Sequence, residues 1–377
     1  MRAWLAICAV ALTGCSAQPE AKAQTDSLAF VTADQEAITQ QAEIKTDLDS
    51  LLDALESAKS NYQNETIEKN LREYWAIRYQ LNDSDLSESQ QSRYDALITE
   101  YGTEVQRANM QAPNSLSAAY NQSQTQLTCK GIVKQGGLVV RQTQPNARVE
   151  VGRSENDTYA QTADKDGVLL VGFDRDEPAA FVRVGEQRVD FDITPREYDT
   201  SRIDGLPKNM VSEYTAEELK KIRKASALKK VGFASMVEEV GFKDGFIFPV
   251  TTHTKTTNFG AQRILNGDPK RPHFGVDLAA PKGTPILAPA DGIVSLASEE
   301  MYFEGSLIMI DHGQGLISYY LHNEDVMVQE GQRVVQGQQI GTVGSRGRST
   351  GPHLCWRLKW RGRNLDPELL TEWPSHG

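Results

Sequence analysis

Several residue types are missing over long parts of this chain. No glycine or proline occurs between Pro19 and Gly102, and this favours helices because neither helix breaker interrupts that length. No acidic residue occurs between Glu330 and Asp366, although the whole chain carries a formal net charge of -11. Such an acidic chain gains little from the release of phosphate counterions, which argues against nucleic acid as its main partner.

Cysteine is also scarce, with four residues in 377. Cys8 and Cys15 lie at the N-terminus, so Cys129 and Cys355 could form one disulfide in an oxidising compartment. Cys355 has a second interpretation. If residues 351–358 form a strand, Cys355 shares a face with His353 and could bind a metal. Both alternatives stay open on the sequence alone.

The N-terminus is predicted to be a targeting segment, with Arg2, an apolar run over 3–12 and then Leu12-Thr13-Gly14-Cys15. The apolar run is too short to cross a bilayer as a helix. Its end resembles a bacterial lipobox. The resemblance implies a signal peptide over 1–15, with Cys15 as the first mature residue and the site of a lipid anchor. Ser16 then implies the inner leaflet of the outer membrane, facing the periplasm; an ordinary secretory signal is the alternative.

Residues 24–112 are predicted to form a helical bundle or coiled coil. Ser87 and Gln90 have the spacing of a capping box. We expect the apolar stripes to pack against one another, and the bundle to act either as a lid or as a docking site for a regulatory protein. Apolar residues recur at helical spacing in three stretches: Ile44, Leu48, Leu51 and Leu55; Ile67, Leu71, Tyr74 and Leu81; Tyr94, Leu97, Tyr101 and Val105.

Short apolar runs separated by glycine-rich turns follow, with a turn signal at Lys165-Asp166-Gly167. We therefore expect a small β-sandwich over 125–205 that acts as a spacer or docking module. The linker 206–245 is expected to hold a helix that begins at Thr215 and Glu218. Its apolar face would carry Leu219, Ile222 and Leu228.

The C-terminal part, 246–370, is β-rich and punctuated by glycine and proline. Five of the six histidines lie in it, which hints at metal chemistry. Three short segments stand out. They are His273-Phe274-Gly275-Val276-Asp277, Tyr320-Leu321-His322 and Gly351-Pro352-His353-Leu354-Cys355.

Together these segments resemble the M23 family of zinc metallopeptidases, the lysostaphin-like or LytM-type cell-wall endopeptidases. The family motifs are H-x-x-x-D, Y-x-H and G-P-H-x-H. The resemblance implies an antiparallel β domain related to the duplicated hybrid motif, within a multidomain α+β chain. By position it implies His273 and Asp277 as zinc ligands and His322 and His353 as catalytic histidines. The third family ligand is a histidine, and Cys355 stands in its place.

The resemblance implies an endopeptidase that cleaves peptide cross-links of bacterial peptidoglycan with one Zn²⁺ per chain. Such an ion lowers the pKa of bound water toward about 7, and a neutral histidine can accept the water proton. The sequence leaves open which of His322 and His353 is that base. We expect Cys355 to keep the zinc but slow turnover, because a thiolate adds negative charge. The alternative is a degenerate domain that binds cell wall or activates a separate amidase.

The acid-free stretch around the third motif carries seven arginines and lysines, from Arg333 to Arg363. It is either a solvated basic edge or a surface that attracts an anionic substrate. Muropeptide stems carry carboxylates. Arg348 and Arg357 are therefore candidate substrate-binding residues.

Overall fold

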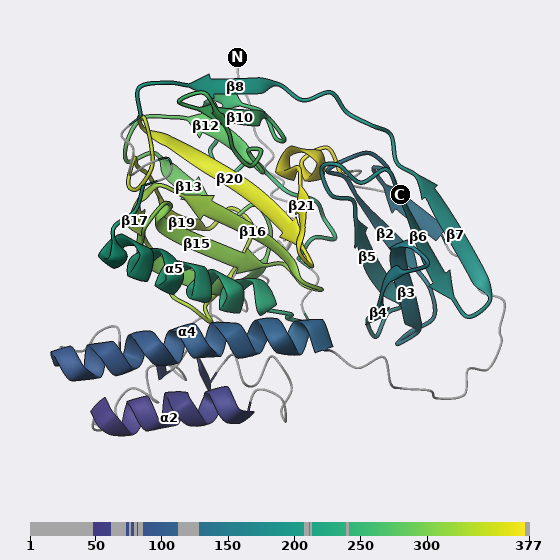
Figure 1. The fold of residues 1–377 in the computed structure, drawn as a ribbon. Helices are drawn as coiled ribbons and strands as arrows, with labels where there is room; N and C mark the ends of the chain where they lie inside the picture. The colour runs from purple at the N-terminus through teal and green to yellow at the C-terminus, as the bar shows by residue number, and fades with distance from the viewer. Residues whose placement is uncertain are drawn as a thin grey trace, which may run out of the picture.

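The computed structural model describes residues 48–61, 73–74, 77–78, 81, 86–111, 128–206, 211, 213–238 and 241–373. The expected signal segment 1–15, with Cys15, lies outside these residues, as do Ile44, Ile67 and Leu71. Within the described ranges, none of the helices combines the length and the apolar character needed to cross a membrane. The described chain is mostly β-structure (Figure 1).

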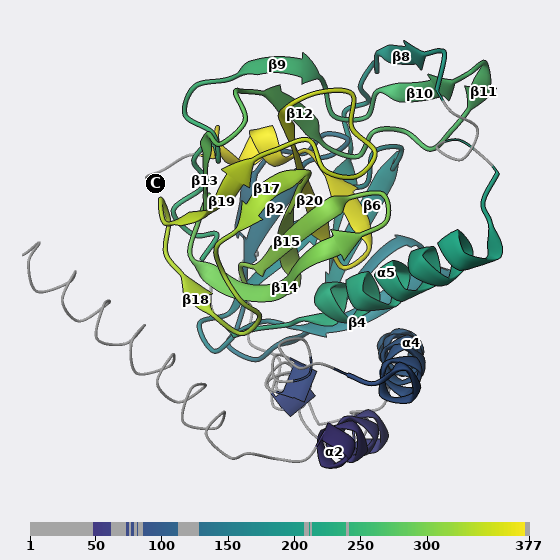
Figure 2. The same cartoon turned by 90° about the vertical axis from the view of Figure 1, so that its left-hand side faces the viewer.

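Three helices lie stacked on one side of a large sheet (Figures 1 and 2). They are α2 (Leu48–Asn61), α4 (Glu88–Gln111) and α5 (Ala216–Ala234). α2 packs on α4, α4 packs on α5, and α5 lies against the sheet. At the crossing of α4 and α5 a Cβ on Gly102 would stand 2.7 Å from the Ala227 carbonyl oxygen, so glycine allows this close approach.

The apolar residues of the expected helical stripes are buried, but they do not pack only against one another. Their core continues onto the sheet through residues such as Leu296 and Met309. The helical region is therefore packed onto the C-terminal domain. The buried stripe residues are Leu51, Leu55, Tyr74, Leu81, Tyr94, Leu97 and Tyr101.

The start of α5 is confirmed, since Thr215 and Glu218 form a complete capping box. Its predicted apolar face is wrong at Leu219, which is 38% exposed. The C-terminal half of α5, not the turn that carries Leu219, packs against the sheet and α4. Small side chains in this half allow the close approach. The buried residues are Ala225, Ala227, Leu228, Val231, Gly232 and Ala234.

Residues 128–192 form two antiparallel sheets that share one hydrophobic core. One sheet has the order β1-β2-β5 and the other β4-β3-β6-β7. This unit packs against the C-terminal domain through a buried ion pair of Arg363 with Glu177 at 3.2 Å and through Arg196 with Asp366 at 2.8 Å. The strands are β1 (Thr128–Gly131), β2 (Leu138–Gln142), β3 (Arg148–Ser154), β4 (Asp157–Thr162), β5 (Val168–Gly172), β6 (Ala179–Val184) and β7 (Gln187–Asp192).

The chain then crosses to the C-terminal domain as β8 (Thr200–Ile203), visible along the top of Figure 1. β8 pairs in parallel with β10 (Gln262–Leu265), which also pairs with β11 (Asp268–Pro269). A strand from before α5 thus borders the C-terminal domain. Sequence alternation did not predict this pairing.

The C-terminal domain consists of an eight-stranded sheet and a three-stranded sheet that share a core. The large sheet has the order β18-β14-β15-β16-β20-β12-β9, with β21 beside β20, and the small sheet the order β13-β19-β17. The strands are β9 (Thr254–Thr257), β12 (Val276–Ala279), β13 (Pro285–Leu287), β14 (Gly292–Met301), β15 (Gly305–Asp311), β16 (Leu316–Leu321), β17 (Asn323–Val326), β18 (Arg333–Val334), β19 (Gln339–Val343), β20 (His353–Trp360) and β21 (Arg363–Leu365), followed by the 3-10 helix η2 (Pro367–Leu370).

Candidate metal centre

The register of the large sheet brings the three sequence motifs together. β20 lies between β12 and β16, and Asp277 stands directly opposite Cys355. Leu321 pairs with Cys355 from the other side, so His322 follows at the end of that strand. His273 precedes β12, and its backbone bonds to Gly260 and Ala261 hold it over the sheet.

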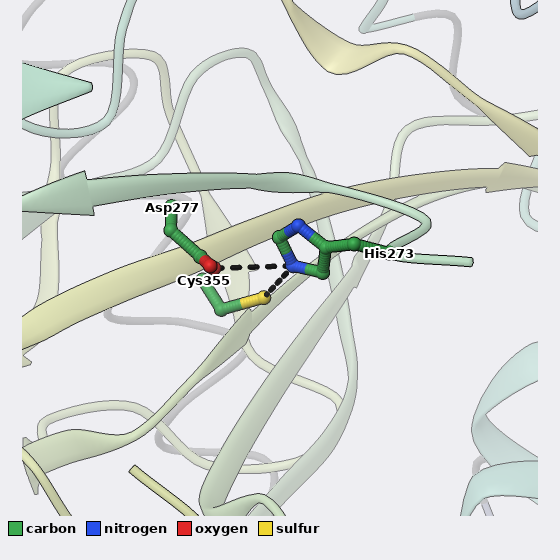
Figure 3. A group of neighbouring side chains, drawn as sticks. All are labelled: His273, Asp277 and Cys355. Carbon is green, nitrogen blue, oxygen red and sulfur yellow. Dashed lines mark hydrogen bonds and ion pairs between the residues drawn. The ribbon is translucent and has the colours of Figure 1, made fainter. Parts of the chain in front are cut away.

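The side chains of His273, Asp277 and Cys355 converge on one point (Figure 3). The His273 Nε2 atom lies 3.1 Å from the Cys355 Sγ atom and 3.1 Å from the Asp277 Oδ1 atom. Tetrahedral zinc with bonds of 2.0 to 2.3 Å needs ligand atoms separated by about 3.5 Å. The nitrogen, oxygen and sulfur donors therefore fit zinc after only small shifts.

A buried oxygen that accepts no hydrogen bond supports this fit. Asp277 Oδ1 is enclosed by protein and, although His273 Nε2 lies 3.1 Å away, it accepts no well-aligned hydrogen bond from any described residue. A carboxylate oxygen in that position is costly unless something positive reaches it. A bound cation would satisfy Oδ1, the imidazole nitrogen and the thiolate together.

Burial sets the protonation of these groups. It lowers the pKa of His273 to about 4 and raises the pKa of Cys355 to about 12. Burial also opposes ionisation of Asp277, but the close contact with His273 outweighs it, so the pKa of Asp277 falls well below its usual range. Metal binding must therefore displace the proton of the Cys355 thiol.

Cys355 is a free and buried cysteine. The expected alternative of a disulfide with Cys129 is therefore contradicted. Its Sγ atom accepts a hydrogen bond from Arg357 Nε at 3.2 Å instead. Arg357 thus contacts one of the candidate metal ligands directly. The sequence predicted Arg357 only as part of a basic run and not as a partner of Cys355.

The two remaining histidines lie beside this cluster. The rings of His322 and His353 are 4.8 Å apart, and His353 Nε2 lies 3.8 Å from Asp277 Oδ1. His322 Nδ1 lies 2.8 Å from the Arg346 carbonyl oxygen, and His353 Nδ1 lies 2.8 Å from the Gly351 carbonyl oxygen. Donation from Nδ1 leaves Nε2 of each neutral ring able to accept a proton.

The backbone at His322 has an unusual conformation. Its φ is 66°, in the left-handed region that residues other than glycine seldom occupy. The His322 N–H donates to the Glu304 carbonyl at 3.0 Å, which helps to hold this turn. Such conformations persist where surrounding contacts enforce them, and they are frequent at functional sites.

A cavity of about 490 Å³ opens beside the cluster. It is lined by Asp277, His322 and His353, by Arg348 and Arg357, and by Arg263 of β10. β8 supplies another part of the wall. Sequence reasoning missed Arg263 and β8, because no local pattern links them to the three motifs.

The C-terminal domain is similar to proteins of known family. The model of peptidase family M23 matches residues 271–367. Peptidoglycan DD-endopeptidase ShyA from Vibrio cholerae is 40% identical over 121 residues, which are 32% of this chain and 28% of that protein. Murein hydrolase activator NlpD from Salmonella dublin is 38% identical over 110 residues, 29% of this chain and 27% of that protein.

The catalytic domain of lysostaphin from Staphylococcus simulans is a similar solved structure, 32% identical with a TM-score of 0.26. That match covers 28% of this chain and 79% of the lysostaphin domain. The chain thus spans less than a third of the length of the two curated relatives. Within that span, the chain carries a domain of peptidase family M23.

Proposed function

We propose that this chain is a zinc-dependent endopeptidase that cleaves peptide cross-links of bacterial peptidoglycan. The observation that carries the proposal is the convergence of His273, Asp277 and Cys355, whose ligand atoms all lie within 4.8 Å of one another. Similarity to a peptidoglycan DD-endopeptidase supports the substrate class.

Different residues of the chain would bind the metal, accept a proton and stabilise the oxyanion. His273, Asp277 and Cys355 would hold one zinc ion, which supplies a water acidic enough to act as nucleophile and a Lewis acid for the scissile carbonyl. His353, whose Nε2 atom lies 3.8 Å from Asp277 Oδ1, is placed to take a proton at that nitrogen. His322 would exchange this role with His353 or, after accepting a proton at Nε2, donate a hydrogen bond to the developing oxyanion.

Variants of the two histidines test the proposal. His322→Ala and His353→Ala should keep one zinc per chain and release at least a hundredfold fewer soluble muropeptides from sacculi, since general acid–base groups contribute about 10²–10⁴-fold. His253→Ala is the matched control, because His253 does not line the cavity. Unchanged release by both site variants would refute the assigned roles.

A second candidate function is a non-catalytic domain that binds cell wall or activates an amidase. Cys355 at the third ligand position and the similarity to a murein hydrolase activator favour it. Zinc-loaded protein that binds sacculi, releases nothing itself and increases release by an added amidase would establish this role.

We also propose that Cys15 carries a lipid anchor and that the protein faces the periplasm from the outer membrane. The Leu12-Thr13-Gly14-Cys15 run supports this. A Cys15→Ser variant that stays in the membrane fraction of cells would contradict it. The helical region would then be a docking site for a regulatory protein.

A further inference from the structure

The cavity beside the candidate metal centre carries more positive than negative side chains. Three arginines line it, Arg263, Arg348 and Arg357, against two acidic residues, Asp277 and Glu304. This imbalance lies in a chain whose formal net charge is -11. A concave site lined by one sign of charge concentrates ligands of the opposite sign.

Both acidic residues already have positive partners. Glu304 forms an ion pair with Lys229 of α5. Asp277 directs Oδ1 at His273 in the ligand cluster, and a bound zinc ion would balance its charge together with that of the Cys355 thiolate. A bound zinc ion would therefore take over the charge of Asp277, which is the ion-pair partner of Arg263 at 3.7 Å.

Arg263 has unused hydrogen-bonding capacity at the cavity wall. Its Nε atom is buried and makes no hydrogen bond to any residue that the structure describes. Its Nη2 atom lies 3.7 Å from Asp277 Oδ2, beyond hydrogen-bonding distance. The side chain is 24% exposed, so a ligand in the cavity can reach the guanidinium.

Arg348 is held at the same cavity by a different element, the loop between β19 and β20. Its guanidinium carbon lies 4.6 Å from the ring centre of Phe303, and its backbone N–H donates to the Phe303 carbonyl at 2.8 Å. A carboxylate in the cavity can therefore meet guanidinium groups from two separate elements, β10 and this loop.

We infer that Arg263 and Arg348 form a subsite for a free carboxylate of the peptide substrate, close to the bond that is cleaved. A guanidinium binds a carboxylate through two parallel hydrogen bonds, and this geometry suits a planar anion. The inference rests on the proposed function. It adds that the enzyme selects cross-linked peptides that keep a free carboxylate near the scissile bond over peptides in which that group is an amide.

The test uses the zinc-loaded full chain and two substrates. One is a purified cross-linked muropeptide dimer, and the other is the same dimer with its carboxyl groups converted to amides. Wild-type protein should show a KM about tenfold higher for the amide at similar kcat, as expected for loss of charge-assisted hydrogen bonds. Equal KM values for the two dimers would overturn the subsite. Dimers amidated only at the terminal or only at the side-chain carboxyl identify which group is bound.

Substitutions then assign the subsite to its residues. Arg263→Gln and Arg348→Gln should each raise KM for the free acid about tenfold and lose the discrimination between acid and amide. Arg263→Lys keeps the charge without the bidentate geometry and should fall between wild type and Arg263→Gln. Arg271→Gln is the matched control, because Arg271 is exposed and does not line the cavity. Glutamine variants that discriminate as wild type does would overturn the assignment.

Equilibrium binding separates this inference from the proposed function. If no dimer is cleaved, the proposed activity fails, and calorimetry with the zinc-loaded chain still decides the subsite. Tighter binding of the free acid, lost in Arg263→Gln with zinc content unchanged, supports it. Equal binding of acid and amide refutes it.

Discussion

At Cys355, the exchange of one ligand type changes the charge of the whole site. A His-Asp-Cys set brings two negative charges to Zn²⁺, where a His-Asp-His set brings one. The Arg357 guanidinium, 3.2 Å from Sγ, restores a positive charge beside the thiolate. Cys355 and Arg357 are therefore best understood as a pair.

A histidine at 355 tests the effect of the thiolate. Cys355→His should raise muropeptide release per bound zinc several-fold, because a neutral ligand leaves the ion a stronger Lewis acid. Zinc content and release are measured on the same sample. Lower activity per bound zinc in Cys355→His would contradict this account.

The pairing with Arg357 predicts a cost for the same variant. Cys355→His places a buried guanidinium beside a positively charged site and should weaken zinc binding by about tenfold, the scale of outer-shell effects on metal affinity. Adding Arg357→Met should recover affinity in the histidine background, whereas Arg357→Met alone should weaken zinc binding. Titration with a competing chelator measures all four proteins; additive effects would show that the two residues are independent.

His312 gives a pH-dependent contribution to stability. Its ring is buried between the Asp291 carbonyl and Ser318 Oγ, each at 2.7 Å, and burial lowers its pKa to about 4. The unfolded chain has a histidine pKa of about 6.5 and so binds more protons between pH 6.5 and 4. The stabilisation present above pH 6.5 is thus lost on acidification, by about 2 kcal/mol at pH 5.

Denaturant unfolding at pH 7, 6 and 5 checks this contribution. His312→Gln is expected to be less stable at pH 7 but to lose about 2 kcal/mol less than wild type between pH 7 and pH 5. Parallel stability profiles for the two proteins would show that His312 is not the group responsible.

Among the elements, the helical region is joined to the large domain by a buried ion pair. The Arg78 and Glu330 side chains are 4% and 7% exposed, and Glu330 also accepts from the Ala297 N–H at 3.2 Å. Removing one partner of a buried pair leaves an uncompensated charge, at a cost of about 3–5 kcal/mol. Replacing both partners by apolar residues is often close to neutral.

Glu330→Gln is therefore expected to destabilise the chain by about 3 kcal/mol, and Arg78→Met with Glu330→Met by much less. The control is Asp53→Asn, which breaks the exposed pair of Arg93 with Asp53 and should change stability far less, because solvent screens such pairs. Thermal unfolding measures all three. A cost for Glu330→Gln no larger than that for Asp53→Asn would contradict the role of the pair.

Some features of the helices and strands could be predicted from the sequence, and others could not. The start of α5 could be predicted because Thr215 and Glu218 are local partners in a capping box. Its buried face could not, since the contacts with the sheet and α4 decide it and leave Leu219 exposed. The pairing of β8 with β10 joins strands some sixty residues apart, and strand alternation carries no information about such a partner.

At the scale of the molecule, the three motifs could be predicted because each is short and each falls on a strand or at its end. Their convergence depends on the order β16-β20-β12, which the sequence did not specify without the family resemblance. Arg263 reaches the cavity from β10, outside the basic run. Arg348 and Arg357 could thus be predicted from the sequence as candidate substrate-binding residues, whereas Arg263 could not.

The central claim is that His273, Asp277 and Cys355 hold a zinc ion with which this domain hydrolyses peptidoglycan. The most direct test is the release of soluble muropeptides from purified sacculi by the full chain after metal removal and after addition of one equivalent of zinc. We predict no release without metal and release that rises with zinc up to one ion per chain. Release that persists without metal, or none at full zinc loading, would contradict the account.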